Sequence, residues 1–219
     1  MKTNQEYKNA ALAALKGNWA AAVVATVIYV VIAVLVSGGD SFANIMHFEP
    51  GIILTFAGVS CILGIFILFP LAIGLVNAFR VLYESGDAAI ASNMFSFGFK
   101  RYLHTVWVYF LMELKIFLWM LLLIVPGFIM AFAYAMTPYI AIEHPEYSAS
   151  ECISASKKMM KGHKFDLLWL YLSFIGWFLL CILTLGIGAF WLEPYVCTAQ
   201  AAFYNDLKSE ISEQAAVTE

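Results

Sequence analysis

Apolar residues gather in six long runs along the chain, and short polar segments separate them. The runs cover residues 18–37, 52–73, 103–125, 127–143, 165–185 and 187–204. A helix rises about 1.5 Å per residue, so roughly 20 apolar residues cross a hydrocarbon core of about 30 Å. Because each run meets or approaches this length, the pattern predicts an all-α fold, a polytopic membrane protein with six transmembrane helices.

The second run continues into further apolar sequence as far as Tyr83. A single helix over 52–83 would be about 48 Å long, which is too long to cross a membrane upright. We expect Pro70 and Gly74 to bend this segment or to let its end emerge into the cytosol.

Three polar or amphipathic segments, 4–16, 85–101 and 148–164, precede successive pairs of apolar runs. The third begins with Ser148 and Glu151 at the spacing of a helix capping box. The pattern therefore predicts three successive helical hairpins with short cytosolic amphipathic lead-in helices, all in a single membrane domain over 1–219. In the third lead-in we expect Ile153, Met159 and Met160 to face lipid, with the lysines turned to headgroups or water.

Basic residues are confined to one side of the predicted bilayer. Eleven of the twelve Lys and Arg residues fall at the termini or in segments 80–102 and 144–164, and the twelfth, Lys115, lies inside a predicted span. Cytoplasmic loops carry an excess of Lys and Arg. The distribution therefore predicts six spans with both the N- and C-termini in the cytoplasm.

The composition supports a membrane protein and restricts the kinds of partner that we expect. The chain is 63% hydrophobic and 12% charged with a net charge of −3, whereas soluble domains are about half apolar and about a quarter charged. We expect the lipid bilayer as a partner, with a protein partner or homo-oligomer as further options and no nucleic acid. The four cysteines form no CxxC spacing, so neither a metal nor a cofactor is implied.

Three charged residues, Glu113, Lys115 and Glu193, form the candidate intramembrane polar site. A charge inside a span costs roughly 2.5–3.5 kcal/mol on insertion scales, so each requires an explanation. Lys115 lies about 15 Å and Glu193 about 9 Å from the outer ends of their spans, and a lysine side chain can extend outward. We therefore expect a Lys115–Glu193 ion pair, with Glu113 protonated or lining a polar cavity. A packing role is favoured over a proton- or ion-coupled pathway.

Four lysines, Lys157, Lys158, Lys161 and Lys164, form a candidate membrane-surface basic patch. Basic residues next to an anionic leaflet hold a helix against the membrane. Ordinary anchoring is the favoured interpretation, and recognition of a lipid or a partner is the alternative.

Several motifs resemble a known family. They are Pro126-Gly127-Phe128-Ile129, Thr137-Pro138-Tyr139-Ile140, Met159-Met160-Lys161-Gly162-His163-Lys164, Leu185-Gly186-Ile187-Gly188 and Ala201-Ala202-Phe203-Tyr204. Together with Leu15-Lys16-Gly17-Asn18-Trp19, they are similar to an uncharacterised bacterial integral membrane family, the domain of unknown function 975. The resemblance implies six helices in the bacterial cytoplasmic (inner) membrane and implies no activity. This chain departs from the family pattern at Met130, where relatives often carry lysine, and at Glu193, where they carry an apolar residue.

Enzymatic signals are weak. No HExxH motif is present, and His144 and His163 lie 19 residues apart without a matching set of metal ligands. We therefore expect a non-enzymatic scaffold, accessory or partner-binding component with no catalytic residue and no metal site. The alternative is a small-molecule or ion transporter that uses Glu113, Lys115 and Glu193, and an intramembrane enzyme is the least favoured option.

Overall fold

A computed structural model describes residues 2–218, with the side chains of all of these except Asp40 and residues 214–218. Every element in this range is a helix, which confirms the predicted all-α class. The helices are α1 (Asn4–Leu15), α2 (Trp19–Ile45), α3 (Pro50–Leu63), the π-helical turn η1 (Gly64–Leu68), α4 (Phe69–Ser85), α5 (Ile90–Lys100), α6 (Tyr102–Leu122), α7 (Ile124–Tyr134), α8 (Thr137–Glu143), α9 (Ala149–Met159), α10 (Lys164–Leu172), α11 (Ile175–Leu183) and α12 (Ala189–Thr218).

The three lead-in segments form the short helices α1, α5 and α9, as the sequence predicts. Two of them begin with complete capping boxes, in which Thr3 pairs with Glu6 and Ser148 pairs with Glu151. In each box the Ser or Thr hydroxyl accepts from a backbone N–H while the glutamate accepts from the cap backbone, so two otherwise unsatisfied donors are paired. These local hydrogen bonds fix where α1 and α9 start.

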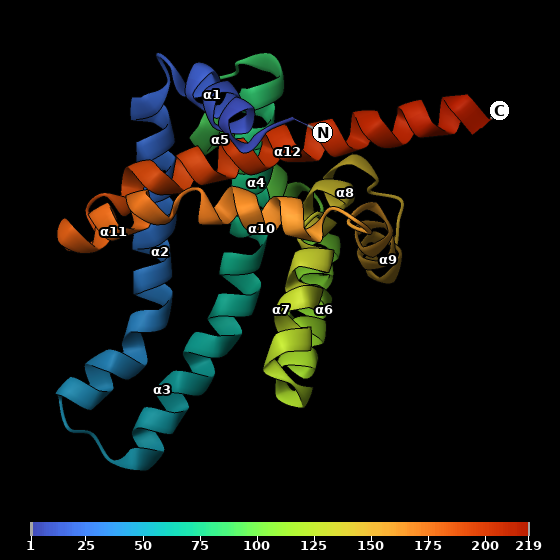
Figure 1. Cartoon of the computed structure of the whole chain (residues 1–219). Coiled ribbons are helices and arrows are strands. Elements are labelled where there is room, and N and C mark those ends of the chain that lie inside the picture. Colours follow the sequence, from blue (N-terminus) through green and yellow to red (C-terminus); the bar gives the residue numbers. More distant parts are fainter. Residues whose placement is uncertain (1, 219) are drawn as a thin grey trace.

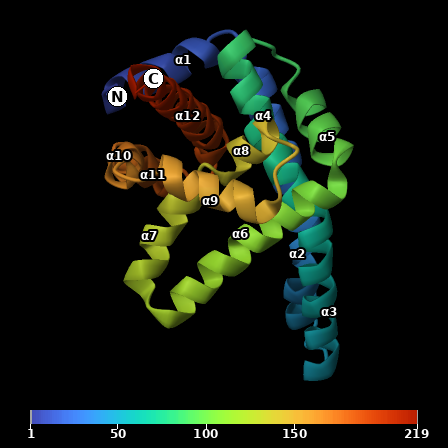
Figure 2. The same ribbon diagram turned by 90° about the vertical axis from the view of Figure 1, so that its right-hand side faces the viewer.

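Three hairpins carry the rest of the chain (Figure 1). The first pairs α2 with the continuous α3–η1–α4, and the second pairs α6 with α7. The third pairs the broken helix α10–α11 with α12, and it runs across the upper part of the first two rather than alongside them (Figure 1). The lead-in helices lie away from the tips of the first two hairpins (Figure 2).

Within residues 2–218, five helical segments are long and apolar enough to cross a membrane. They are Trp19–Gly39, Pro50–Ser85, Tyr102–Leu122, Ile124–Glu143 and Lys164–Leu183. They correspond to the first five predicted spans, although α2 extends well past the predicted end at residue 37. The sixth predicted span, 187–204, forms the start of α12 and is not among the five, so the count of six stays a prediction.

The helix over the second run is distorted next to Pro70, one of the two predicted positions, and not at Gly74. The helix contains the π-helical turn η1 directly before Phe69 and Pro70, and such turns distort a helix locally. Gly74 instead allows α5 to approach closely, because a Cβ at residue 74 would overlap the carbonyl oxygen of Met94. A Cβ at Gly98 of α5 would likewise overlap the carbonyl oxygen of Pro70. The two glycines therefore bring the backbones of α4 and α5 together.

The apolar face of α9 packs against protein, which corrects the prediction that it faces lipid. Ile153 and Met160 are buried, and Met159 is half-buried. Helix α9 packs against α6, α7 and α8. The buried Ser156 donates to the carbonyl oxygen of Ala133 at 2.9 Å and accepts from the backbone N–H of Met136 at 3.2 Å. It thereby satisfies backbone groups at the break between α7 and α8.

The buried core and the bare apolar surface occupy different parts of the molecule. Large fully buried side chains come mainly from the lead-in helices, α4, α8 and α12, and include Tyr7, Phe79, Met94, Tyr139 and Tyr204. In contrast, α3 and α11 contain no buried residue. The lower part of the first hairpin therefore depends on its surroundings to cover its apolar side chains.

Candidate functional site

The predicted Lys115–Glu193 ion pair is not formed among the described residues. Helix α12 packs mainly against α1, α2, α4 and α11, whereas α6 packs mainly against α4, α7, α8 and α9. From its start, α6 runs toward the tip of the second hairpin, while α12 crosses the upper part of the molecule (Figure 1). Lys115 lies in the part of α6 that leads away from α12, so similar depth along two helices does not bring these side chains together.

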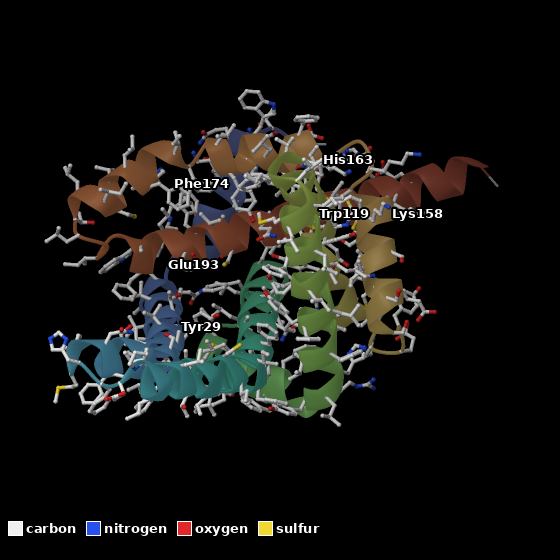
Figure 3. All side chains as sticks on the ribbon, turned by 90° about the horizontal axis from the view of Figure 1, so that it is seen from below. Tyr29, Trp119, Lys158, His163, Phe174 and Glu193 are labelled. Atoms are coloured by element: carbon white, nitrogen blue, oxygen red, sulfur yellow. The ribbon has the colours of Figure 1, made fainter. Side chains whose placement is uncertain are left out.

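Glu193 lies instead among polar groups from three hairpin helices. The Cys197 thiol is 3.6 Å from its Oε1 in hydrogen-bond geometry. Tyr29 of α2 and Tyr171 of α10 lie within electrostatic range of the carboxylate. Figure 3 shows Glu193 on the side of α12 that faces α2 and Tyr29. Glu193 is itself exposed in the isolated chain.

Tyr109 of α6 connects Glu113 to this group. It lies within electrostatic range of Glu113, Tyr29 and Tyr171. Glu113 is exposed on α6 in the isolated chain, and it forms no ion pair among the described residues. We refer to Tyr29, Tyr109, Tyr171, Glu113 and Glu193 as the tyrosine–carboxylate cluster. It contains two of the three predicted residues and leaves out Lys115.

Sequence reasoning missed the three tyrosines of the cluster. Each of them lies in the first helix of a hairpin, in α2, α6 or α10. This placement is a usable signal, because one polar aromatic residue per hairpin can meet the others where the hairpins come together. A tyrosine in an apolar run is otherwise read as a core or interface residue.

A second polar cluster surrounds Glu143 at the end of α8. Its Oε1 lies 2.7 Å from Arg80 Nη1, and its Oε2 accepts from Lys208 Nζ at 2.7 Å and from the Tyr204 hydroxyl at 3.0 Å. The Glu143 and Arg80 side chains are 12% and 15% exposed, respectively. Their pairing joins α4, α8 and α12. The sequence does not predict this cluster, because Glu143 lies more than 60 residues from each of its three partners.

Helix α1 is fixed to α12 by a third polar contact. The Tyr7 hydroxyl donates to Asp206 Oδ2 at 2.5 Å, and the backbone N–H of Lys2 donates to the same oxygen at 2.8 Å. Burial alone would raise the pKa of Asp206, but these hydrogen bonds outweigh it and lower the pKa below its usual value. The carboxylate is therefore stabilised in its charged form.

The four predicted patch lysines, Lys157, Lys158, Lys161 and Lys164, line one hollow together with Ser154. An adjoining pocket contains Lys158, Lys161, His163, Tyr204 and Lys208. Figure 3 shows Lys158 and His163 on the side of the molecule where α9 lies near α12. The structure therefore brings the predicted patch together. No group of three or more His, Cys, Asp or Glu side chains in the described range is placed to hold a metal ion.

Residues 120–211 match a family model described as a protein of unknown function, DUF975. Over this segment, which is less than half of the chain, the protein is similar to that family. The match confirms the resemblance drawn from the sequence and covers the chain from the end of α6 into α12. No curated protein and no solved structure matches the chain.

The DUF975 segment contains Glu143, Glu193 and all four patch lysines. It begins after Glu113 and Lys115, so two of the three predicted intramembrane residues lie outside it. Its description assigns no activity.

Proposed function

We propose that the protein is a non-enzymatic component of a cytoplasmic membrane that binds a helix of a partner membrane protein through its first hairpin. In this proposal both termini lie in the cytoplasm, as the distribution of basic residues favours. The observation that carries the proposal is the surface of α3. None of its residues is buried, even though it belongs to the longest candidate span.

Small residues on this surface favour a protein partner over lipid alone. Gly51, Gly58 and Cys61 are all exposed, and a Cβ at Gly51 or Gly58 would meet no neighbouring atom. At spacings of seven and three residues they share one side of α3. Small residues let helices approach closely in membranes, where interhelical packing replaces the hydrophobic effect as the driving force. Leu54, which is 74% exposed, lies on the same side.

Site-specific photo-crosslinking in membranes tests the proposal. A photoreactive amino acid at Leu54 should give a discrete protein adduct, and Gly58→Leu should abolish it by blocking close approach. Val59→Leu, another substitution of an exposed residue on α3, is the matched control and should leave the adduct intact. Two differently tagged copies show whether the partner is a second copy of the chain. Adducts with lipid alone would contradict the proposal.

Transport of a small solute or ion is the second candidate function, and the tyrosine–carboxylate cluster favours it. Glu193 lies close to tyrosines of two other hairpin helices, α2 and α10, and Glu113 lies close to Tyr109 of its own helix. Carboxylates within apolar helices and close to polar side chains are typical of residues that line a polar pathway. Proteoliposomes that dissipate a proton gradient, with loss of this activity in Glu193→Gln and retention in Glu84→Gln, would support transport. Sealed proteoliposomes with no ion or solute flux would argue against it.

A further inference from the structure

Two adjoining pockets on the surface of α9 share two of the lysines that line them. One has a volume of about 390 Å³ and is lined by Lys157, Lys158, Lys161 and Lys164 with Ser154. The other has a volume of about 400 Å³ and shares Lys158 and Lys161. It adds His163, which precedes α10, Lys208 and Glu210 of α12, and Glu143 of α8. We call these two pockets together the lysine hollow. It is large enough to hold a phosphate group and part of the molecule that carries it.

The lysines that line the hollow outnumber its acidic residues. In the part of the chain that the structure describes, none of Lys157, Lys158, Lys161 and Lys164 forms an ion pair. Two acidic residues, Glu143 and Glu210, line the second pocket, and both already have basic partners other than these four lysines. His163 lies 3.2 Å from Asp166 and 3.8 Å from Glu210, and Glu143 is held by Arg80 and Lys208. Four like charges around one concave surface therefore favour an anionic ligand.

Aromatic residues place the hollow at the level of lipid headgroups. Phe165 follows Lys164 directly and Trp169 lies one helical turn further on, and they are 69% and 61% exposed. Exposed aromatic residues next to a basic segment are typical of the membrane–water interface. Basic pockets at this level, on the cytoplasmic side, bind the headgroups of anionic lipids.

We propose that the lysine hollow binds the phosphate group of an anionic membrane lipid. Lys158 and Lys161, which line both pockets, are the central contacts. Lysine ammonium groups suit phosphate as compact charged donors on flexible side chains. The site is distinct from α3 and from the tyrosine–carboxylate cluster, so it does not depend on either proposed function.

Lipid titration of the full-length chain in a neutral detergent tests the site. The probes are short-chain phosphatidylglycerol, phosphatidylcholine with the same acyl chains, and inorganic phosphate. The wild-type chain should bind phosphatidylglycerol at least tenfold more tightly than phosphatidylcholine. Inorganic phosphate should compete only in the millimolar range, because it lacks the acyl chains that hold a lipid at the interface.

Paired substitutions separate a built site from general positive charge. Lys158→Gln with Lys161→Gln should lower the preference for phosphatidylglycerol at least tenfold, and arginine at both positions should restore it. Lys16→Gln with Lys100→Gln removes the same charge from exposed positions outside the hollow and should change the preference less than threefold. All four lysines are exposed, so the variants should elute as the wild type does in size-exclusion chromatography. Equal losses in both pairs, or equal binding of the two lipids, would overturn the proposal. Inorganic phosphate binding as tightly as phosphatidylglycerol would assign the hollow to free phosphate instead.

Discussion

Replacing Gly74 by alanine should separate α4 from α5. In an exposed helix the same replacement stabilises by roughly 1 kcal/mol, because alanine has the higher helix propensity. Here the new Cβ would overlap the carbonyl oxygen of Met94, which belongs to the backbone and cannot turn away. The two helices must therefore move apart.

The cost follows from what surrounds this contact. Overpacking a tight contact costs typically 1–3 kcal/mol. Met94, Leu71 and Ile73 are almost fully buried beside it, and part of their packing is lost when the helices separate. Fully burying one such side chain is worth about 1.5–3 kcal/mol. After the propensity gain is subtracted, we expect Gly74→Ala to destabilise the fold by about 2–4 kcal/mol.

The matched control is Gly58→Ala in α3, where a Cβ meets no neighbouring atom. It should leave the free energy of unfolding unchanged or raise it by up to about 1 kcal/mol. Equilibrium unfolding in mixed micelles, followed by circular dichroism, compares the two variants. If Gly74→Ala is as stable as Gly58→Ala, the close approach of α4 and α5 is wrong.

Three further substitutions test the polar contacts of the fold. Glu143→Gln removes the carboxylate 2.7 Å from Arg80 and leaves that arginine only the more distant Glu84 at 3.8 Å, so it should cost about 2–4 kcal/mol in micelle unfolding; an unchanged midpoint would count against the cluster. The lowered pKa of Asp206 means that its contact with Tyr7 stabilises α1 above about pH 4 and is lost as the pH falls below that value. The hydrogen-exchange protection factors of α1, corrected for the intrinsic pH dependence of amide exchange, should therefore fall in acid, and Tyr7→Phe should weaken this pH dependence. Ser156→Ala should cost about 1–3 kcal/mol, because buried backbone groups lose their partner; no change would mean that they are satisfied otherwise.

Local signals in the sequence are sufficient to predict the elements and their order. The capping residues Ser148 and Glu151 lie three positions apart, so their interaction is visible in the sequence itself. The apolar runs have the length of membrane spans for the same local reason. These features need no knowledge of how the hairpins pack.

Contacts between hairpins could not be predicted in this way. Similar depth along two predicted spans suggests that Lys115 meets Glu193. The third hairpin, however, runs across the other two (Figure 1). Neither segment contains a local sequence signal that predicts this arrangement. Glu143 and Arg80 are 63 residues apart, and neither segment marks the other as its partner. The sequence alone predicts that Gly74, four residues after Pro70, bends the helix. In the structure its role is to let α5 pack closely against α4.

Labelling from the two sides of the membrane tests most directly whether the hairpins cross it. In a variant in which the four native cysteines are replaced, a cysteine is introduced either at Glu49, at the tip of the first hairpin, or at Lys157 on α9. A membrane-impermeant maleimide should label position 49 in intact spheroplasts and position 157 only after lysis. Labelling of both positions, or of position 157 alone, before lysis would contradict a protein whose hairpins project through the membrane from a cytoplasmic base.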